Sequence, residues 1–258
     1  ESGDDRGRIY RLIPPKWKQP EPVKLSAAGP GDLVRALESD NGWTRQTAHR
    51  LLWERGDRTT VPRLVETVKR SKQPLARAHS LWILHGLKAL EDSVLVAALD
   101  DPSPRVREQA TVLAEDRLDR SGFQPALARL ASDPDPRVRY QVAFSLGTLD
   151  AADRELPLSR LAKRAPSDGH LRFAVMSSSL GLENKLLRAL LQDRAFLAAK
   201  GSSAWLTDFA RLAGANPKPT EAVSILQLVL GEPQPDGRRA ELLTALGNGL
   251  SRRGQSVL

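Results

Sequence analysis

The sequence of 258 residues contains no cysteine, one methionine and few aromatic residues, which make up 5% of the chain. Without cysteine, these residues cannot form a disulfide, a thiolate zinc site, an iron–sulfur centre or a c-type haem attachment. No stretch approaches about 18 uncharged apolar residues, so the sequence predicts no membrane span. The first six residues lack the basic and then apolar order of a signal peptide. We therefore expect any export signal to lie outside this sequence.

Motifs of catalysis and of cofactor binding are also missing. There is no Gly-x-Ser-x-Gly element, no Gly-x-Gly-x-x-Gly element and no phosphate-binding loop. The four histidines are His49, His79, His85 and His170. His79 and His85 are six residues apart, which places them on different helix faces, whereas a spacing of four would suit zinc. We predict no catalytic residue, no cofactor-binding residue and no metal ligand in this chain.

The excess positive charge is spread along the sequence and is not concentrated in one segment. The formal net charge is +8, yet residues 32–150 carry 18 basic and 17 acidic side chains. Residues 1–31 carry 6 and 4, and residues 151–258 carry 15 and 10. A nucleic-acid groove more often shows a concentrated basic stripe. We therefore favour a soluble surface with mild excess charge over a nucleic-acid partner.

What the sequence does contain is an arginine that returns at nearly constant spacing. Arg45, Arg77, Arg107, Arg139 and Arg172 are separated by 32, 30, 32 and 33 residues. A fixed period of this size indicates one structural unit stacked on copies of itself. The clearest two units share the pattern Asp-Pro-x-Pro-Arg-Val-Arg, at residues 101–107 and 133–139.

Each period has the pattern of two short helices joined by a turn. Apolar residues recur at helical spacing, prolines stand at turns and first helical positions, and glycines follow the helix ends. We predict an all-α, right-handed superhelix of about seven helix pairs over residues 30–258. Residues 1–29 are different: residues 7–13 alternate like a strand, and the following prolines predict an extended linker.

The helix pair with Asp-Pro-x-x-x-Val-Arg at its inner turn resembles HEAT repeats, over about residues 30–252. In HEAT arrays the turn aspartate and the following arginine form ladders between repeats. The resemblance implies such a structural role for Asp101 with Arg107 and for Asp133 with Arg139. The other recurring arginines (Arg45, Arg77 and Arg172) lack a matching aspartate in their own unit, so the ladder is expected to be incomplete there.

A narrower resemblance extends over the whole chain. Gly-Arg-Ile-Tyr-Arg-Leu at residues 7–12, together with residues 43–57 and 76–87, is similar to a bacterial multidomain family of planctomycetes labelled membrane-bound dehydrogenases. In that family a β-propeller precedes HEAT repeats and a cytochrome c domain often follows. The resemblance implies an extracytoplasmic, periplasmic spacer or docking array between such modules. No enzymatic residue is carried over, because the propeller and haem motifs are absent here.

The leading hypothesis is a non-catalytic scaffold that binds protein domains through its second helices, without a cofactor. Trp17 and Trp43 are the candidate docking residues, and Trp17 is also the best candidate for holding the linker on the array. The alternative is an enzyme, a HEAT-like DNA glycosylase for alkylated bases, for which Asp208 near Trp205 would be the carboxylate. A phycobilin-type lyase is a third interpretation, supported only by the generic repeat.

Overall fold

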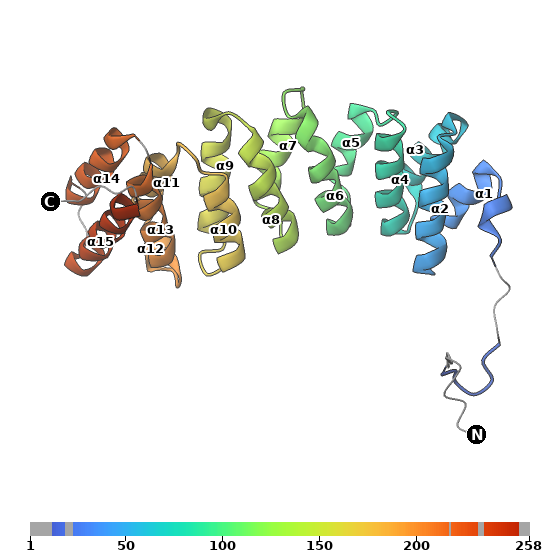
Figure 1. Cartoon of the computed structure of the whole chain (residues 1–258), viewed down its shortest axis with the longest axis horizontal. Coiled ribbons are helices and arrows are strands. Elements are labelled where there is room, and N and C mark those ends of the chain that lie inside the picture. The colour runs from blue at the N-terminus through green and yellow to red at the C-terminus, as the bar shows by residue number, and fades with distance from the viewer. Residues whose placement is uncertain (1–11, 19–22, 217, 232–234, 253–258) are drawn as a thin grey trace, which may run out of the picture.

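The computed structural model describes residues 12–18, 23–216, 218–231 and 235–252, and all regular structure in these ranges is helical. The helices form seven pairs that stand side by side in an elongated row, with the described termini at opposite ends (Figure 1). The first helices of the pairs are α1 (Pro30–Ala36), α3 (Val61–Arg70), α5 (Asp92–Ala98), α7 (Phe123–Leu130), α9 (Ala151–Arg164), α11 (Glu183–Leu191) and α14 (Pro219–Gly231). The second helices are α2 (Gly42–Arg55), α4 (Pro74–Gly86), α6 (Pro104–Ala114), α8 (Pro136–Ser145), α10 (Gly169–Ser177), α13 (Ser202–Ala215) and α15 (Asp236–Arg252).

Five short elements complete the chain order. They are α12 (Arg194–Ala198) in the sixth pair and the 3-10 turns η1 (Leu25–Ala27), η2 (Arg58–Thr60), η3 (Glu115–Arg117) and η4 (Leu146–Thr148). The predicted all-α solenoid is thereby confirmed. None of the helices in the described ranges is both long and apolar enough to cross a membrane.

Local side-chain and backbone chemistry sets where the helices begin and end. Proline occupies the first turn of α1, α4, α6 and α8, where its missing N–H costs no helical hydrogen bond. The Oδ1 atom of Asn41 accepts the N–H of Trp43 at 2.9 Å and caps α2. Asp135 caps α8 in the same way, through the N–H of Arg137 at 2.8 Å. Gly56 ends α2 in the left-handed conformation, at φ 60°.

The core runs continuously along the array instead of forming one globule. Each second helix contacts the second helix of the next unit from α2 to α10, and α13 contacts α15. Buried leucines such as Leu33, Leu81 and Leu127 are fully covered and belong to one apolar cluster that extends from Leu25 to Leu246. Burying each such side chain contributes about 1.5–3 kcal/mol, and no unit covers its own apolar side alone.

The sixth and seventh pairs approach each other more closely than side chains allow. Gly214 on α13 and Gly249 on α15 lie at the crossing of the two helices. A Cβ on Gly249 would lie 2.2 Å from the carbonyl oxygen of Arg211, and one on Gly214 would lie 2.3 Å from that of Leu246. Glycine is therefore required at both positions.

The segment before the first pair is only partly described. The strand predicted at residues 7–13 falls mostly outside the described residues, and Leu12 and Ile13 have no regular structure. Leu25, which belongs to the expected linker, is buried in the array. Arg55 holds this turn by donating to the carbonyls of Ser26 and Ala28 at 2.8 and 2.7 Å. Residues 12–18 lie apart from the helices in Figure 1, and docking of the linker by Trp17 stays a prediction.

Candidate functional site

Two of the recurring arginines form bidentate ion pairs across unit boundaries. The Nε and Nη2 atoms of Arg77 donate to the two carboxylate oxygens of Asp101 at 2.7 and 2.6 Å. Arg107 donates in the same way to Asp133, at 2.7 and 2.8 Å. The remaining nitrogen, Nη1, donates to a turn carbonyl of the arginine's own unit, that of Ser71 for Arg77 and that of Asp101 for Arg107, both at 2.7 Å. Each arginine thus joins its own turn to the next one.

This pairing differs from the pairs expected from the sequence. The carboxylate partner of Arg107 is Asp133 of the next unit, whereas Asp101 offers it only a backbone carbonyl. Arg77 does have a carboxylate partner, although its own unit lacks an aspartate. Within the described part of the chain Arg139 has no carboxylate partner, because Pro166 stands at the turn position of the following unit. Its Nε is buried without a hydrogen-bond partner among the described residues.

The first unit shows the same gap. Arg45 donates through Nη1 to the carbonyl of Ser39 at 2.7 Å, and its buried Nε has no hydrogen-bond partner among the described residues. The turn position of the next unit is Ser71, which is too short to form a bidentate pair. The ladder of ion pairs therefore spans units two to four and stops on either side.

The ladder engages the guanidinium groups of Arg77 and Arg107, which an anion-binding row would need as donors. Arg77 and Asp101 are only 9% and 8% exposed in their side chains. The hydrogen bonds that Arg107 donates to Asp133 raise the pKa of the Arg107 guanidinium. Asp101 and Asp133 also accept the N–H two residues later, at 2.8 and 2.9 Å, which closes each turn. These contacts assign a structural role to the ladder.

The exposed side of the second helices carries large apolar side chains. Counted from the recurring arginine, positions −2, +1, +5 and +8 fall on one helix face, because they are three or four residues apart. We call the following set, in which Leu180 lies in the turn just after α10, the aromatic face: Trp43, Trp53, Leu75, Trp82, Tyr140, Phe144, Phe173 and Leu180. Trp43 and Phe173 are 63% and 67% exposed, whereas Trp82 is half-buried and donates to Gln109 at 2.9 Å.

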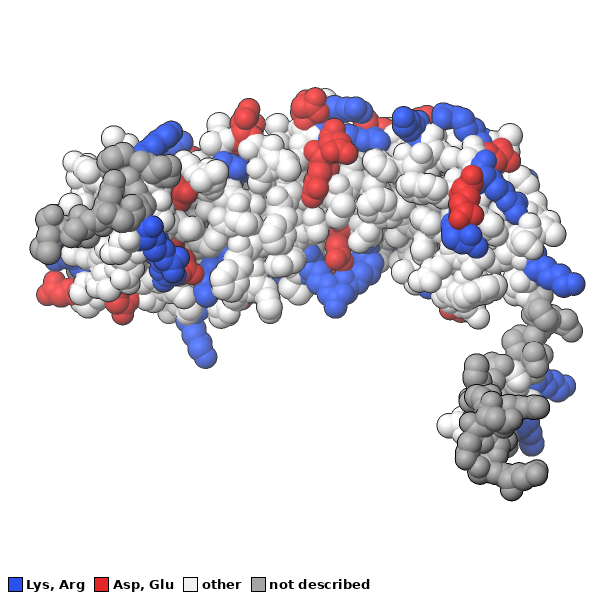
Figure 2. All heavy atoms as spheres, in the orientation of Figure 1, with Lys and Arg blue, Asp and Glu red and all other residues white. Residues whose placement is uncertain are grey.

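Charged side chains also stand at these positions, among them Arg50, Arg105 and Arg137. Arg50 lies 3.0 Å from Glu54, and Arg105 lies 2.6 Å from Glu108. In Figure 2 the middle of the array is covered mainly by residues other than Lys, Arg, Asp and Glu, and many charges gather along one long edge. The aromatic face is therefore interrupted at α6, where Arg105 and Glu108 occupy its positions and pair with each other. The sequence contained this signal, because all its members share the register of the arginines.

The residues required by the glycosylase alternative do not form a cleft. Trp205 is fully buried, and its Nε1 donates to the carbonyl of Pro166 at 2.8 Å. Asp208 lies 3.0 Å from Arg172 and 2.9 Å from Arg211, so both cations neutralise its charge. The pair is thus part of the packing between the fifth and sixth units.

Comparisons with known proteins gave one family match, which covers the middle of the chain. Residues 92–178 match the family described as HEAT repeats. This segment of the chain is therefore similar to HEAT repeats. A comparison with curated proteins gave no match. Among solved structures, a designed armadillo repeat protein in complex with peptide (KR)4 is 14% identical, with coverage of 86% of this chain and 100% of that chain and a TM-score of 0.35. An engineered protein is 17% identical, with coverage of 88% and 98% and a TM-score of 0.31.

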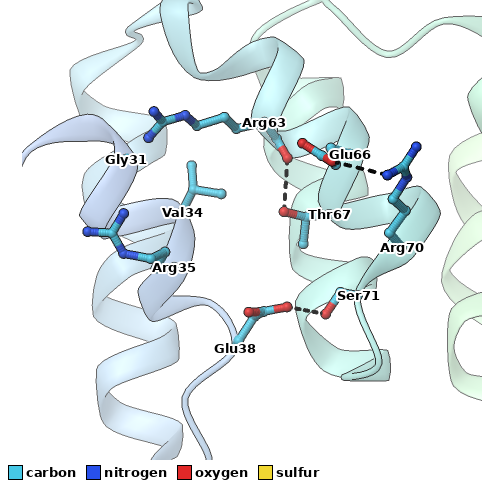
Figure 3. Close-up of a pocket in the computed structure, with 9 residues that line it drawn as sticks. All are labelled: Gly31, Val34, Arg35, Glu38, Arg63, Glu66, Thr67, Arg70 and Ser71. Carbon is cyan, nitrogen blue, oxygen red and sulfur yellow. Dashed lines mark hydrogen bonds and ion pairs between the residues drawn. The ribbon is translucent and has the colours of Figure 1, made fainter.

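A hollow on the opposite row of the HEAT array is lined by arginine and glutamate. It lies between α1 and α3, and Figure 3 shows Arg35, Arg63 and Arg70 around it. Its carboxylates are engaged: Glu38 accepts from Ser71 at 2.5 Å, and Glu66 lies 3.7 Å from Arg70. The hollow is open to solvent, and its charges of both signs are largely paired. The residues that line it therefore do not form a cluster of unpaired charges for a ligand.

Two histidines of the HEAT array come together although the sequence separates them. The Nδ1 atoms of His49 on α2 and His79 on α4 are 3.0 Å apart, and His49 stacks on Trp53 with ring centroids 6.2 Å apart. Desolvation lowers the pKa of His49, and it lowers the pKa of His79 to about 4 with help from the charges of His49 and Arg45. Sequence reasoning missed this pair because it considered spacing within one helix, whereas the two residues are one repeat apart.

Proposed function

We propose that this chain is a non-catalytic protein-binding scaffold, with the aromatic face as its docking surface. The observation that carries the proposal is the shared register of the exposed rings on α2, α8 and α10, with the half-buried Trp82 on α4. The ladder arginines Arg77 and Arg107 direct their donors into the array. The outward side of α2, α4, α8 and α10 therefore carries large apolar side chains, whereas α6 has Arg105 and Glu108 at the same positions.

Side chains of this kind favour a protein partner. Tryptophan, tyrosine and phenylalanine supply large contact area with little conformational entropy, and they dominate the binding energy of many interfaces. Exposed large apolar side chains that gather at one register mark an interaction surface more often than single exposed residues do. Because Arg50 and Arg105 are paired with glutamates, the surface carries little excess positive charge that would attract a polyanion.

The context of the scaffold is the finer part of the proposal. The similarity of residues 7–12, 43–57 and 76–87 to the planctomycete-type dehydrogenase family supports an extracytoplasmic spacer between a propeller and a cytochrome module. In that arrangement any chemistry belongs to the attached modules and this region holds no cofactor. The aromatic face would then position one redox module relative to the other.

The docking surface is tested by site-specific crosslinking. A photoreactive residue at position 173, in the aromatic face, should crosslink one defined protein domain in the cells that produce the protein. The control position is Leu156 on α9, which is 59% exposed but lies on the other row. The captured domain is then titrated against the Trp43→Ala and Phe173→Ala variants, each of which should weaken binding by about tenfold or more.

Two results would refute the docking surface. One is equal crosslinking from both positions, and the other is unchanged affinity of the variants. The glycosylase alternative has its own test, which is binding of duplex DNA at low and moderate salt. Binding with a steep salt dependence would favour it over the scaffold.

A further inference from the structure

Two histidines from consecutive repeats face each other at the junction of the first two units. His49 and His79 are both partly buried, and their rings meet edge to face with centroids 4.9 Å apart. The 3.0 Å between their Nδ1 atoms allows one ring to donate a hydrogen bond to the other. No carboxylate is among the groups that lower the pKa values of His49 and His79.

The separation of the two nitrogens also fits coordination of one metal ion. A first-row ion such as zinc lies about 2.0–2.1 Å from an imidazole nitrogen. At that bond length, ligands at neighbouring corners of a square are about 2.9 Å apart, and those of a tetrahedron are about 3.3–3.4 Å apart. The observed 3.0 Å is closer to the square arrangement, which is typical of Cu²⁺ and Ni²⁺ rather than Zn²⁺.

The protonation state of the pair suits a metal. Because both pKa values are lowered, the rings are neutral at pH 7, which is the form that coordinates an ion. When an ion binds both Nδ1 atoms, the ring that donated its Nδ1 proton carries that proton on Nε2 instead, so no proton is lost. The charge of Arg45 opposes a cation and limits the affinity.

We propose that His49 and His79 form a two-histidine binding site for Cu²⁺. Among the divalent first-row ions, Cu²⁺ binds nitrogen ligands most tightly. It is therefore the ion that a site with only two protein ligands would hold best. Within the described residues no three metal-binding side chains gather, so water completes the coordination. A bound ion would tie α2 to α4 and thereby fix the first HEAT unit on the second.

The test is a titration of the full 258-residue chain with CuCl₂ in a buffer that does not chelate metals. Trp53 reports binding, because its ring stacks on His49 and paramagnetic Cu²⁺ quenches nearby fluorescence. We expect saturable quenching by one equivalent, reversed by EDTA. The His49→Gln and His79→Gln variants should each raise the dissociation constant by roughly tenfold or more, since both remove a direct ligand. The control is His170→Gln, which should bind as the parent chain does.

A second measurement keeps the test independent of how well the variants fold. The electron paramagnetic resonance spectrum of the unaltered chain with one equivalent of Cu²⁺ should show a tetragonal centre with two coupled imidazole nitrogens. A spectrum with one imidazole nitrogen or none would overturn the proposal. So would unsaturable quenching, or equal affinity in the His79→Gln and His170→Gln variants. Tighter binding of Zn²⁺ than of Cu²⁺ would refute the assignment of the metal.

Discussion

Removal of one ladder carboxylate should destabilise this protein far more than removal of its neighbour. Asp101→Ala leaves the guanidinium of Arg77 buried without a counter-ion, because both side chains are less than 10% exposed. Breaking a buried pair in this way costs about 3–5 kcal/mol. The substitution also removes the acceptor for the N–H of Ser103, which closes the turn.

The adjacent residue supplies the matched control. Asp100 lies 2.5 Å from Arg129, but their side chains are 60% and 55% exposed. Exposed pairs contribute about 0–1 kcal/mol because water and salt screen them. Asp100→Ala removes the same charge from the same turn, so the two variants differ mainly in the burial of the partner.

The measurement is urea unfolding of the parent and the two variants, followed by far-ultraviolet circular dichroism. The slope m must be fitted freely, because a repeat array can lose its all-or-none transition. A third variant, Arg77→Met with Asp101→Leu, removes both charges and should cost less than Asp101→Ala alone. Equal losses for Asp100→Ala and Asp101→Ala would refute the structural ladder.

Three further predictions follow from other contacts. The double substitution Ser71→Asp with Glu38→Gln should give Arg45 its missing carboxylate partner, since the second change removes a repelling carboxylate. We expect the free energy of unfolding to rise by about 1.5–3 kcal/mol. The control, Ser71→Asn with Glu38→Gln, should not raise it. Since burial lowers the pKa of His79 from its ordinary value of 6.5 to about 4, the unfolded chain binds more protons between these values. Stability should therefore be fully present above pH 6.5 and fall as the pH decreases toward 4, and His79→Gln should flatten this dependence in urea melts. Gly249→Ala should lower the melting temperature because its Cβ would meet a backbone oxygen at 2.2 Å, whereas Gly237→Ala in the same helix meets no atom within 4 Å and should not.

The repeat period predicted the fold because it is a long-range signal. A helix pair of about 30 residues cannot bury its apolar side alone, so a recurring pattern implies stacking whatever the details of each helix. The prolines at the turns predicted where helices begin, and Gly56 predicted where α2 ends. The structure places these helix ends there for the same local reasons. The approach of α13 to α15 at Gly249 could not be predicted, because a glycine within a helix has several explanations.

The direction of the ladder and the histidine pair were hidden for one common reason. A periodic sequence shows which residues are equivalent, but it does not show which neighbouring unit a side chain reaches. Arg107 is six residues from Asp101 and 26 from Asp133, yet its carboxylate partner is the distant one. The structure gives the missing rule, which is that a ladder arginine reaches forward by one unit. Applied to the sequence, this rule identifies Ser71 and Pro166 as the turn positions where the carboxylate is missing. The junctions before these turns have polar contacts, such as Ser71 with Glu38 and Arg154 with the carbonyl of Gly147, but no ladder ion pair. They should therefore open before the junctions that Asp101 and Asp133 hold, as measured by native-state hydrogen exchange.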